Sequence, residues 1–180
     1  MTGGKAFGVN RDYQVECRNL LMRRDTALKP YGTEGIDVRF RAGGTTWTFD
    51  VVLTSPNDCL VVAECRRWAT PVKQEAVAGF AKKVDLVRDA RRVPVAGVFF
   101  VKTAYQVGAL RLGDYLGIQL AAVSEEDGFS HLYFYRWDHT KNRRIRDAVI
   151  FLPFLGPTSR VFPPTVTVKR RRARGRLTRG

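Results

Sequence analysis

The most constraining feature of this sequence is a series of apolar segments between residues 59 and 123 that alternate between strand-like and helix-like spacing. The segments CLVVAEC, VAGVFFV and IQLAAV are apolar almost throughout, which is typical of strands buried on both faces. Between them, apolar residues recur at helical spacing, in a long segment from Val72 to Val87 and in a shorter one from Tyr105 to Leu116. This alternation predicts parallel strands joined by right-handed crossovers.

The preceding part of the chain predicts one helix and two further strands. Apolar residues at helical spacing indicate a helix from about Asp12 to Leu28, which Lys29–Gly32 should end. Alternating residues predict a strand over 36–41, a turn at 42–44 and a second strand over 46–53. In that second strand Asp50 should point away from a face formed by Trp47, Phe49, Val51 and Leu53. Thr70 and Pro71 are expected to begin the next helix as its N-cap and first residue.

The expected fold class is α/β, a mixed central sheet flanked by helices in the order α-βββ-α-β-α-β. With 180 residues, the chain is long enough for one good core. We expect a core over residues 1–124 and a β extension packed on it over 125–160. Residues 161–180 should form a basic, disordered tail.

Net charge restricts the classes of partner. The chain carries a formal charge of +14, and seven basic residues and no acid lie between Lys169 and Gly180. A field of this sign attracts polyanions such as nucleic acids.

No stretch resembles a membrane span or a secretion signal, so we expect a cytoplasmic protein without a membrane partner. The three cysteines have no CxxC spacing, which predicts reduced thiols. The two histidines have no acid or cysteine at a matching spacing, which argues against a histidine-based nucleophile or a zinc centre.

Three residues in the second and third strands suggest chemistry. Glu64 and Arg66 share one face of their strand because side chains alternate, and pairing with the preceding strand can bring Asp50 beside them. Two carboxylates so close repel each other unless a cation lies between them, and oxygen ligands suit Mg²⁺ or Mn²⁺. The alternative is a structural ion pair of Glu64 with Arg66 or Arg67.

Two other features leave alternatives open. Glu16 lies near the apolar stripe of the first helix, where it either reaches inward or makes a surface ion pair with an arginine. Late aromatic residues beside arginines either stack on nucleic-acid bases or pack in the ordinary way; they are Tyr133, Phe134, Tyr135 and Trp137.

The order of these motifs resembles a known nuclease family. The segments ECRRWATPV, KQEAVAGFAKKVDLV and AGVFFVKTAYQVGALRLGDYLGIQL, together with Asp50 on the preceding strand, resemble the PD-(D/E)xK nuclease superfamily and its Mrr-like restriction endonuclease branch. The similarity covers roughly Asp12 to Val123. It implies a restriction-endonuclease-like core.

The resemblance also implies roles for individual residues. Asp50 and Glu64 would bind Mg²⁺ or Mn²⁺, with the main-chain carbonyl of Cys65 and Glu16 as further ligands. Asp37, in the sequence GID, is a rival to Asp50. Arg66 stands where the family has lysine, and arginine cannot take up or release a proton near neutral pH. Three readings follow: Arg66 acts electrostatically, a nearby lysine such as Lys73 substitutes, or the site is inactive.

The resulting hypothesis is a metal-dependent DNA endonuclease of restriction or repair type, acting on duplex or branched DNA, with a homodimer as its expected form for cutting both strands. The alternatives are a catalytically inactive nuclease fold that only binds DNA and a protein-interaction scaffold. The candidate DNA-contacting residues are all basic: Arg67, Lys73, Lys82, Lys83, Arg143, Arg144, Lys169, Arg170, Arg171 and Arg172.

Overall fold

The computed structural model describes residues 4–126 and 129–151. It contains three helices and eight strands in these ranges, in the order α1 (Gly4–Arg24), β1 (Lys29–Pro30), β2 (Ile36–Ala42), β3 (Thr45–Thr54), β4 (Leu60–Arg66), α2 (Gln74–Arg91), β5 (Val95–Val101), α3 (Val107–Tyr115), β6 (Ile118–Glu126), β7 (Phe129–Asp138) and β8 (Arg143–Phe151). The predicted tail lies outside the described residues.

All described strands belong to one mixed sheet. Its order is β1-β3-β4-β5-β6-β7-β8, with β2 pairing along the rest of β3. The central pairs β4–β5 and β5–β6 are parallel, whereas every other pair is antiparallel. The two crossover helices connect the parallel strands, so this part of the predicted topology is confirmed.

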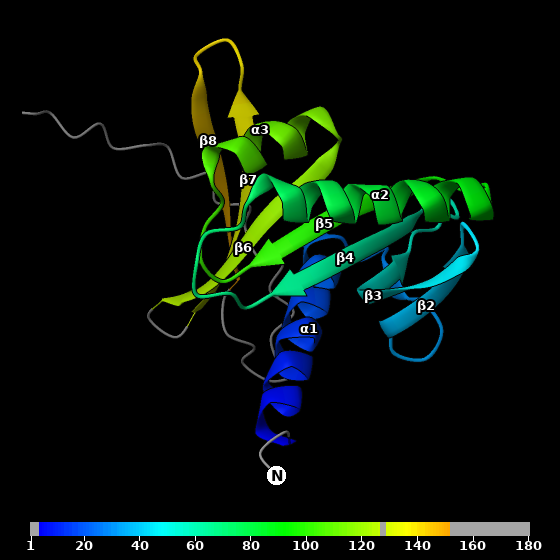
Figure 1. The fold of residues 1–180 in the computed structure, drawn as a ribbon. Coiled ribbons are helices and arrows are strands. Elements are labelled where there is room, and N and C mark those ends of the chain that lie inside the picture. Colours follow the sequence, from blue (N-terminus) through cyan, green and yellow to red (C-terminus); the bar gives the residue numbers. More distant parts are fainter. Residues whose placement is uncertain (1–3, 127–128, 152–180) are drawn as a thin grey trace, which may run out of the picture.

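Helices cover both faces of the sheet (Figure 1). α1 packs on one face through Tyr13, Cys17, Leu20 and Leu21, which meet residues such as Ala63 and Phe100. α2 and α3 pack on the other face, where α2 buries Val77, Phe80, Ala81, Val84 and Val87. The predicted fold class, a mixed sheet flanked by helices in the order α-βββ-α-β-α-β, is confirmed.

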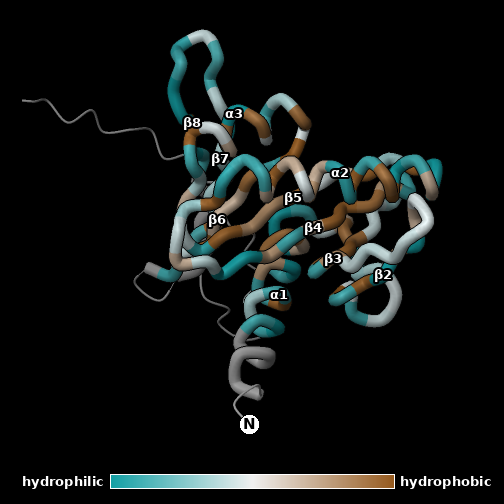
Figure 2. Tube along the Cα trace, in the orientation of Figure 1, coloured by the Kyte–Doolittle hydropathy of each residue, from teal (hydrophilic) through white to brown (hydrophobic). Residues whose placement is uncertain are grey.

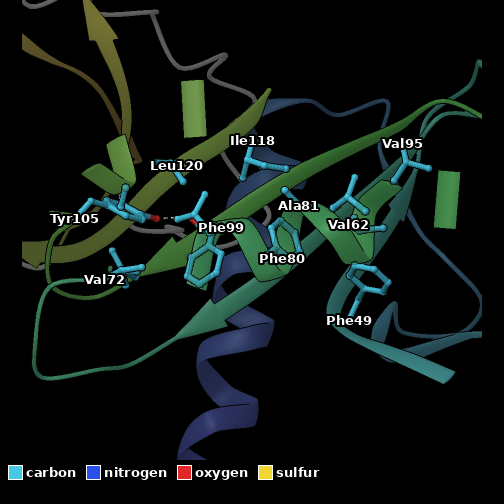
Figure 3. Packing of buried hydrophobic residues seen from close by; sticks show 14 of the residues in the cluster. Phe49, Val62, Val72, Phe80, Ala81, Val95, Phe99, Tyr105, Ile118 and Leu120 are labelled. Carbon is cyan, nitrogen blue, oxygen red and sulfur yellow. Dashed lines mark hydrogen bonds between the residues drawn. The ribbon is translucent and has the colours of Figure 1, made fainter. Parts of the chain in front are cut away.

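The α2 face holds the larger of the two apolar clusters. Figure 3 shows Phe80 between Phe49 and Phe99, and the ring pairs Phe49–Phe80 and Phe80–Phe99 meet edge to face. The hydroxyl of Tyr105 donates a hydrogen bond to Phe99 and contacts the Ala121 carbonyl at 2.8 Å, which ties β5 to β6. Figure 2 shows the apolar colour concentrated along the central strands of the sheet.

Several predicted boundaries are wrong. α1 ends at Arg24 and not near Leu28, because Lys29 and Pro30 pair with Thr54 and Leu53 as the short strand β1. α2 begins at Gln74 with Lys73 as its N-cap, and not at Thr70 and Pro71. The segment before it is held elsewhere: Val72 bridges Tyr105 in parallel and donates its backbone N–H to Ala104.

The three cysteines are free thiols, as predicted, and Cys17 and Cys65 are buried. No helix within residues 4–126 and 129–151 is long and apolar enough to span a membrane.

Candidate active site

The two strands that carry the predicted acids separate at the level of Asp50 and Glu64. The ladder between β3 and β4 ends at Val51 and Ala63, so the next pair, Asp50 and Glu64, is not formed. On the other side of β3, the ladder with β2 omits Asp37, which adopts a positive φ of 51°. Polar groups of both neighbours are therefore left facing Asp50.

The side chains of β3 also change face at this point. Phe49 packs under α2, whereas Val51 and Leu53 pack under α1. The prediction that Trp47, Phe49, Val51 and Leu53 share one face is therefore wrong for Val51 and Leu53, whereas Trp47 and Phe49 do lie on the same side. An irregularity at Asp50 interrupts the alternation, in the manner of a β-bulge. The Asp50 carboxylate then meets the end of β4 that is not paired with β3.

Asp50 is held by two hydrogen bonds from different elements. The backbone N–H of Cys65 donates to Asp50 Oδ2 at 2.6 Å. The carboxylate thus replaces the main-chain acceptor on β3 that this N–H would have in a continuous ladder. The amide of Gln14, on α1, donates to Oδ1 at 3.1 Å. The carboxylate is thereby fixed at the end of β4.

Glu64 is buried, with 4% of its surface exposed, and has two cationic partners. Arg66 pairs with Oε1, and Lys83 Nζ lies 3.2 Å from Oε2. Lys83 comes from α2, whose apolar stripe presses this part of the helix onto the sheet. A buried carboxylate is costly unless it is paired, and here both of its oxygens are.

Sequence reasoning did not assign Gln14 or the Glu64–Lys83 contact to this site. Gln14 is buried, and its Nε2 donates to Asp37 Oδ1 as well as to Asp50 Oδ1, each at 3.1 Å. Gln14 thus connects Asp37 and Asp50, the two candidates for one metal-binding acid in the sequence. In the sequence, the one indication that Gln14 faces the sheet is its position beside Tyr13, on the buried side of α1. For Lys83, the corresponding indication is that it directly precedes Val84 of the apolar stripe of α2.

The electrostatics of the site favour a further cation. Burial raises the pKa of Asp50, and the negative charge of Glu64 raises it too. The Cys65 N–H, Arg66 and Gln14 oppose these effects and lower the pKa. Because the two carboxylates still repel each other, a cation beside Asp50 would relieve both the desolvation and the repulsion.

Candidate metal ligands within the described residues are few. No group of three or more His, Cys, Asp and Glu side chains lies close enough there to hold a metal ion. The Cys65 carbonyl can add a third oxygen, because backbone groups of successive strand residues point to alternate sides. The Arg66 carbonyl accepts a bond from Lys102 on the β5 side, so the Cys65 carbonyl faces β3 and Asp50.

Glu16 is not brought into this group. It is half-buried and lines an open groove between α1 and the end of β6, with residues such as Asp12, Arg23 and Glu125. Burial raises the pKa of Glu16, and Lys102 and Arg67 lower it while Glu125 raises it. None of these charged neighbours of Glu16 is among the partners of Asp50 and Glu64.

The other predicted basic residues are dispersed. Lys73, the N-cap of α2, and Lys82, on α2 itself, are both exposed. Within the described residues Lys83, and not Lys73, is the lysine that pairs with Glu64. Arg67 is exposed beyond β4, and its guanidinium lies 5.9 Å from the centre of the Tyr13 ring. Arg143 and Arg144 belong to β8, whereas Lys169–Arg172 lie outside the described residues.

The fold and the site define a mixed α/β domain with two carboxylates and two cations where β3 leaves β4. No protein-family model and no curated protein matches this sequence. Among solved structures, the chain is similar to AF1548, described as a protein of unknown function, with 16% identity and a TM-score of 0.52 over 62% of this chain and 57% of that one. This likeness shows a shared fold.

Two further solved structures are similar at lower scores. EndoMS in a complex with dsDNA has 20% identity and a TM-score of 0.44, over 63% of this chain and 46% of that one. A repair endonuclease from Pyrococcus abyssi has the same identity and TM-score, over 58% and 45% of the two chains. The chain thus spans about half the length of the structures it matches.

Proposed function

We propose that this chain is a metal-dependent DNA endonuclease in which Asp50 and Glu64 form the catalytic acid pair. The observation that supports this best is the arrangement around the end of β4. Asp50 and Glu64 come from separating strands and lie close enough there to repel each other. Glu64, the more deeply buried of the two, forms ion pairs with Arg66 and Lys83. An ordinary structural ion pair needs one acid and one base, and it does not account for a second, half-buried carboxylate, that of Asp50, beside the pair.

The donor set fits Mg²⁺ better than a metal that needs a complete protein cage. Mg²⁺ is commonly bound by one or two carboxylates, and water and substrate phosphate complete its six ligands. Asp50, Glu64 and the Cys65 carbonyl are oxygen donors of this kind. When bound, the ion would polarise a phosphodiester and lower the pKa of an attacking water.

Lys83 and Arg66 divide the role of the motif lysine between them. The Arg66 guanidinium can stabilise negative charge, whereas the Lys83 amine on α2 supplies the lysine side chain that can position an attacking water. Lys83 contacts the Glu64 oxygen opposite the one that Arg66 holds. The replacement of the family lysine by Arg66 therefore leaves an amine within reach of the same acid.

DNA is the proposed substrate because the chain is strongly basic. The net charge of +14 favours a polyanion, and Lys73, Lys82 and Arg67 are exposed on the segments that lead out of the site. Cutting both strands of a duplex with one site per chain favours a homodimer, and duplex and branched DNA are both candidate substrates.

The alternative is a nuclease fold that binds DNA without cutting it. Both oxygens of Glu64 are already occupied by cations, which is the observation in its favour. An inactive domain would keep such an ion pair as a purely structural feature.

Cleavage of supercoiled plasmid and of branched DNA in Mg²⁺ or Mn²⁺ tests the proposal. We expect metal-dependent nicking by the native chain and its loss in Glu64→Ala. Arg66→Lys should retain activity, and Lys83→Ala should lower the rate by roughly 10²-fold or more. The control is Lys29→Ala, because this exposed lysine on β1 has the same charge and is not among the candidate DNA-contacting residues. Salt-sensitive DNA binding without any cleavage by the native chain would instead support the alternative.

A further inference from the structure

The late aromatic residues do not form a free stacking platform. Tyr133, Phe134 and Trp137 are each no more than 9% exposed, so bases have no access to their faces. Tyr133, Tyr135 and Trp137 pack toward α3, whereas Phe134 packs toward α1. The packing interpretation of these rings is therefore the one that the structure supports.

Arginines cover three of these rings on the α3 side. The guanidinium carbon lies 4.4 Å from the ring centre for Arg146 over Tyr133, and 5.6 Å for Arg144 over Tyr135. Arg111, from α3, lies 4.7 Å from the centre of the Trp137 ring. These three residues, Arg111, Arg144 and Arg146, form what we call the arginine ladder.

Strand register explains why the ladder forms. Arg144 pairs with Trp137 and Arg146 with Tyr135, so both arginines share a face with the rings. Two residues of one strand on the same face are roughly 7 Å apart. Arg144 and Arg146 therefore follow one another along β8, on the hairpin that projects past α3 in Figure 1, and Arg111 adds a third guanidinium from α3 over the next ring of β7.

The acids of the hairpin do not neutralise the ladder. Asp138 pairs with Arg143 and Asp147 with Arg136, and by alternation these four residues belong to the opposite face of the hairpin. Within residues 129–147, no carboxylate is found in an ion pair with Arg144 or Arg146. Arg111 bonds a neutral group, the Asn142 side-chain oxygen, at 2.8 Å. All three ladder arginines are exposed.

From these observations we propose that the arginine ladder binds the phosphate backbone of DNA, at a surface separate from the Asp50–Glu64 site. Guanidinium groups match phosphate geometry, and stacking on buried rings holds them in place before a ligand arrives, which lowers the entropic cost of binding. A repeating anion suits three successive guanidinium groups better than a single phosphate does. The ladder rests on DNA as the proposed ligand but not on cleavage.

DNA binding by the full chain in EDTA, followed by fluorescence anisotropy against salt concentration, tests this. The test variant carries Arg111→Gln, Arg144→Gln and Arg146→Gln. Its control removes three exposed charges elsewhere, through Arg23→Gln, Lys29→Gln and Arg41→Gln. Three lost phosphate contacts should reduce the slope of log K against log salt by roughly 2.7 and the affinity by roughly 10- to 100-fold. The control should change the slope by less than about one.

Other outcomes would contradict the proposal that the arginine ladder binds DNA. A slope within about one of the native value contradicts it, as does a control that loses as much as the test variant. A test variant that keeps DNA binding but loses binding to polyglutamate assigns the surface to an acidic protein, which also contradicts it. Because EDTA prevents metal-dependent cleavage, a chain that never cuts DNA but shows the predicted slope change leaves the ladder supported while the endonuclease proposal fails.

A second variant guards against failure to fold. Replacement of all three arginines by lysine keeps the charge but removes the planar fork that stacks on the rings. We expect the native salt slope with a several-fold loss of affinity. Native affinity in this variant would overturn the role of the fixed guanidinium groups.

Discussion

Asp50 illustrates how one residue can be held in an unfavourable state by its surroundings. Burial raises its pKa, and nearby Glu64 adds to this effect, whereas the Cys65 N–H is the strongest opposing influence. The raised pKa means that the folded chain binds a proton on Asp50 more tightly than the unfolded chain does. The charged form therefore costs stability, as is common at sites that bind a cation.

Asp50→Asn should reveal this cost through its dependence on pH. For a carboxyl with a raised pKa, the native state loses stability as pH rises from the ordinary value of 3.8 through the raised value. We expect Asp50→Asn to melt at a higher temperature than the native chain near neutral pH, with the difference shrinking as pH falls through this window. Thermal unfolding from pH 3.5 to 7.5 measures it, and a difference that grows toward acid pH would contradict the assignment.

At the scale of elements, α1 connects the apolar core to the site. Its buried residues hold it against the sheet, and Gln14 then reaches two carboxylates on neighbouring strands. Arg11 strengthens the same attachment through Glu34 at 2.5 Å, and Arg18 donates to the Glu34 carbonyl. The helix therefore fixes both the start of β2 and the irregular part of β3.

Loss of the Gln14 amide should loosen this attachment. Gln14→Leu leaves the Asp37 and Asp50 oxygens without that donor, and we expect a loss of about 1–3 kcal/mol in the free energy of unfolding. Urea denaturation followed by fluorescence measures the change. The control Gln119→Leu, at an exposed position on β6, should stay within about 0.5 kcal/mol of the native value. An equal loss in the free energy of unfolding for both substitutions would contradict the role of Gln14 in holding α1 to the sheet.

Much of the fold could be predicted from the sequence because its signals are local. The continuous apolar strands and the stripe of α2 follow from burial on one or both faces, and their order gives the parallel crossovers. The face change at Asp50 could not be predicted, because simple alternation assumes an unbroken ladder. Where α2 begins was also mispredicted, because a bridge between Val72 and Tyr105 overrides the helix-start signal of Thr70 and Pro71.

The candidate site was predictable only in part, for the same reason. Asp50, Glu64 and Arg66 lie within 16 residues of one another on adjacent strands, so periodicity could relate them. Gln14 and Lys83 reach the site from helices on opposite faces of the sheet, and nothing local fixes such contacts. Glu16 was selected for its charge, but its position on α1 turns it toward Lys102 and Arg67.

For the whole molecule, the central claim is that the end of β4 holds a divalent cation for DNA hydrolysis. Calorimetric titration of Mn²⁺ into the full chain, with and without DNA, tests this most directly. We predict one binding site, weakened by roughly ten-fold or more in Asp50→Asn and in Glu64→Gln. The control Asp58→Asn, in the exposed turn before β4, should bind as the native chain does. Equal Mn²⁺ affinity in all four proteins, or no binding by the native chain even with DNA, would contradict the account.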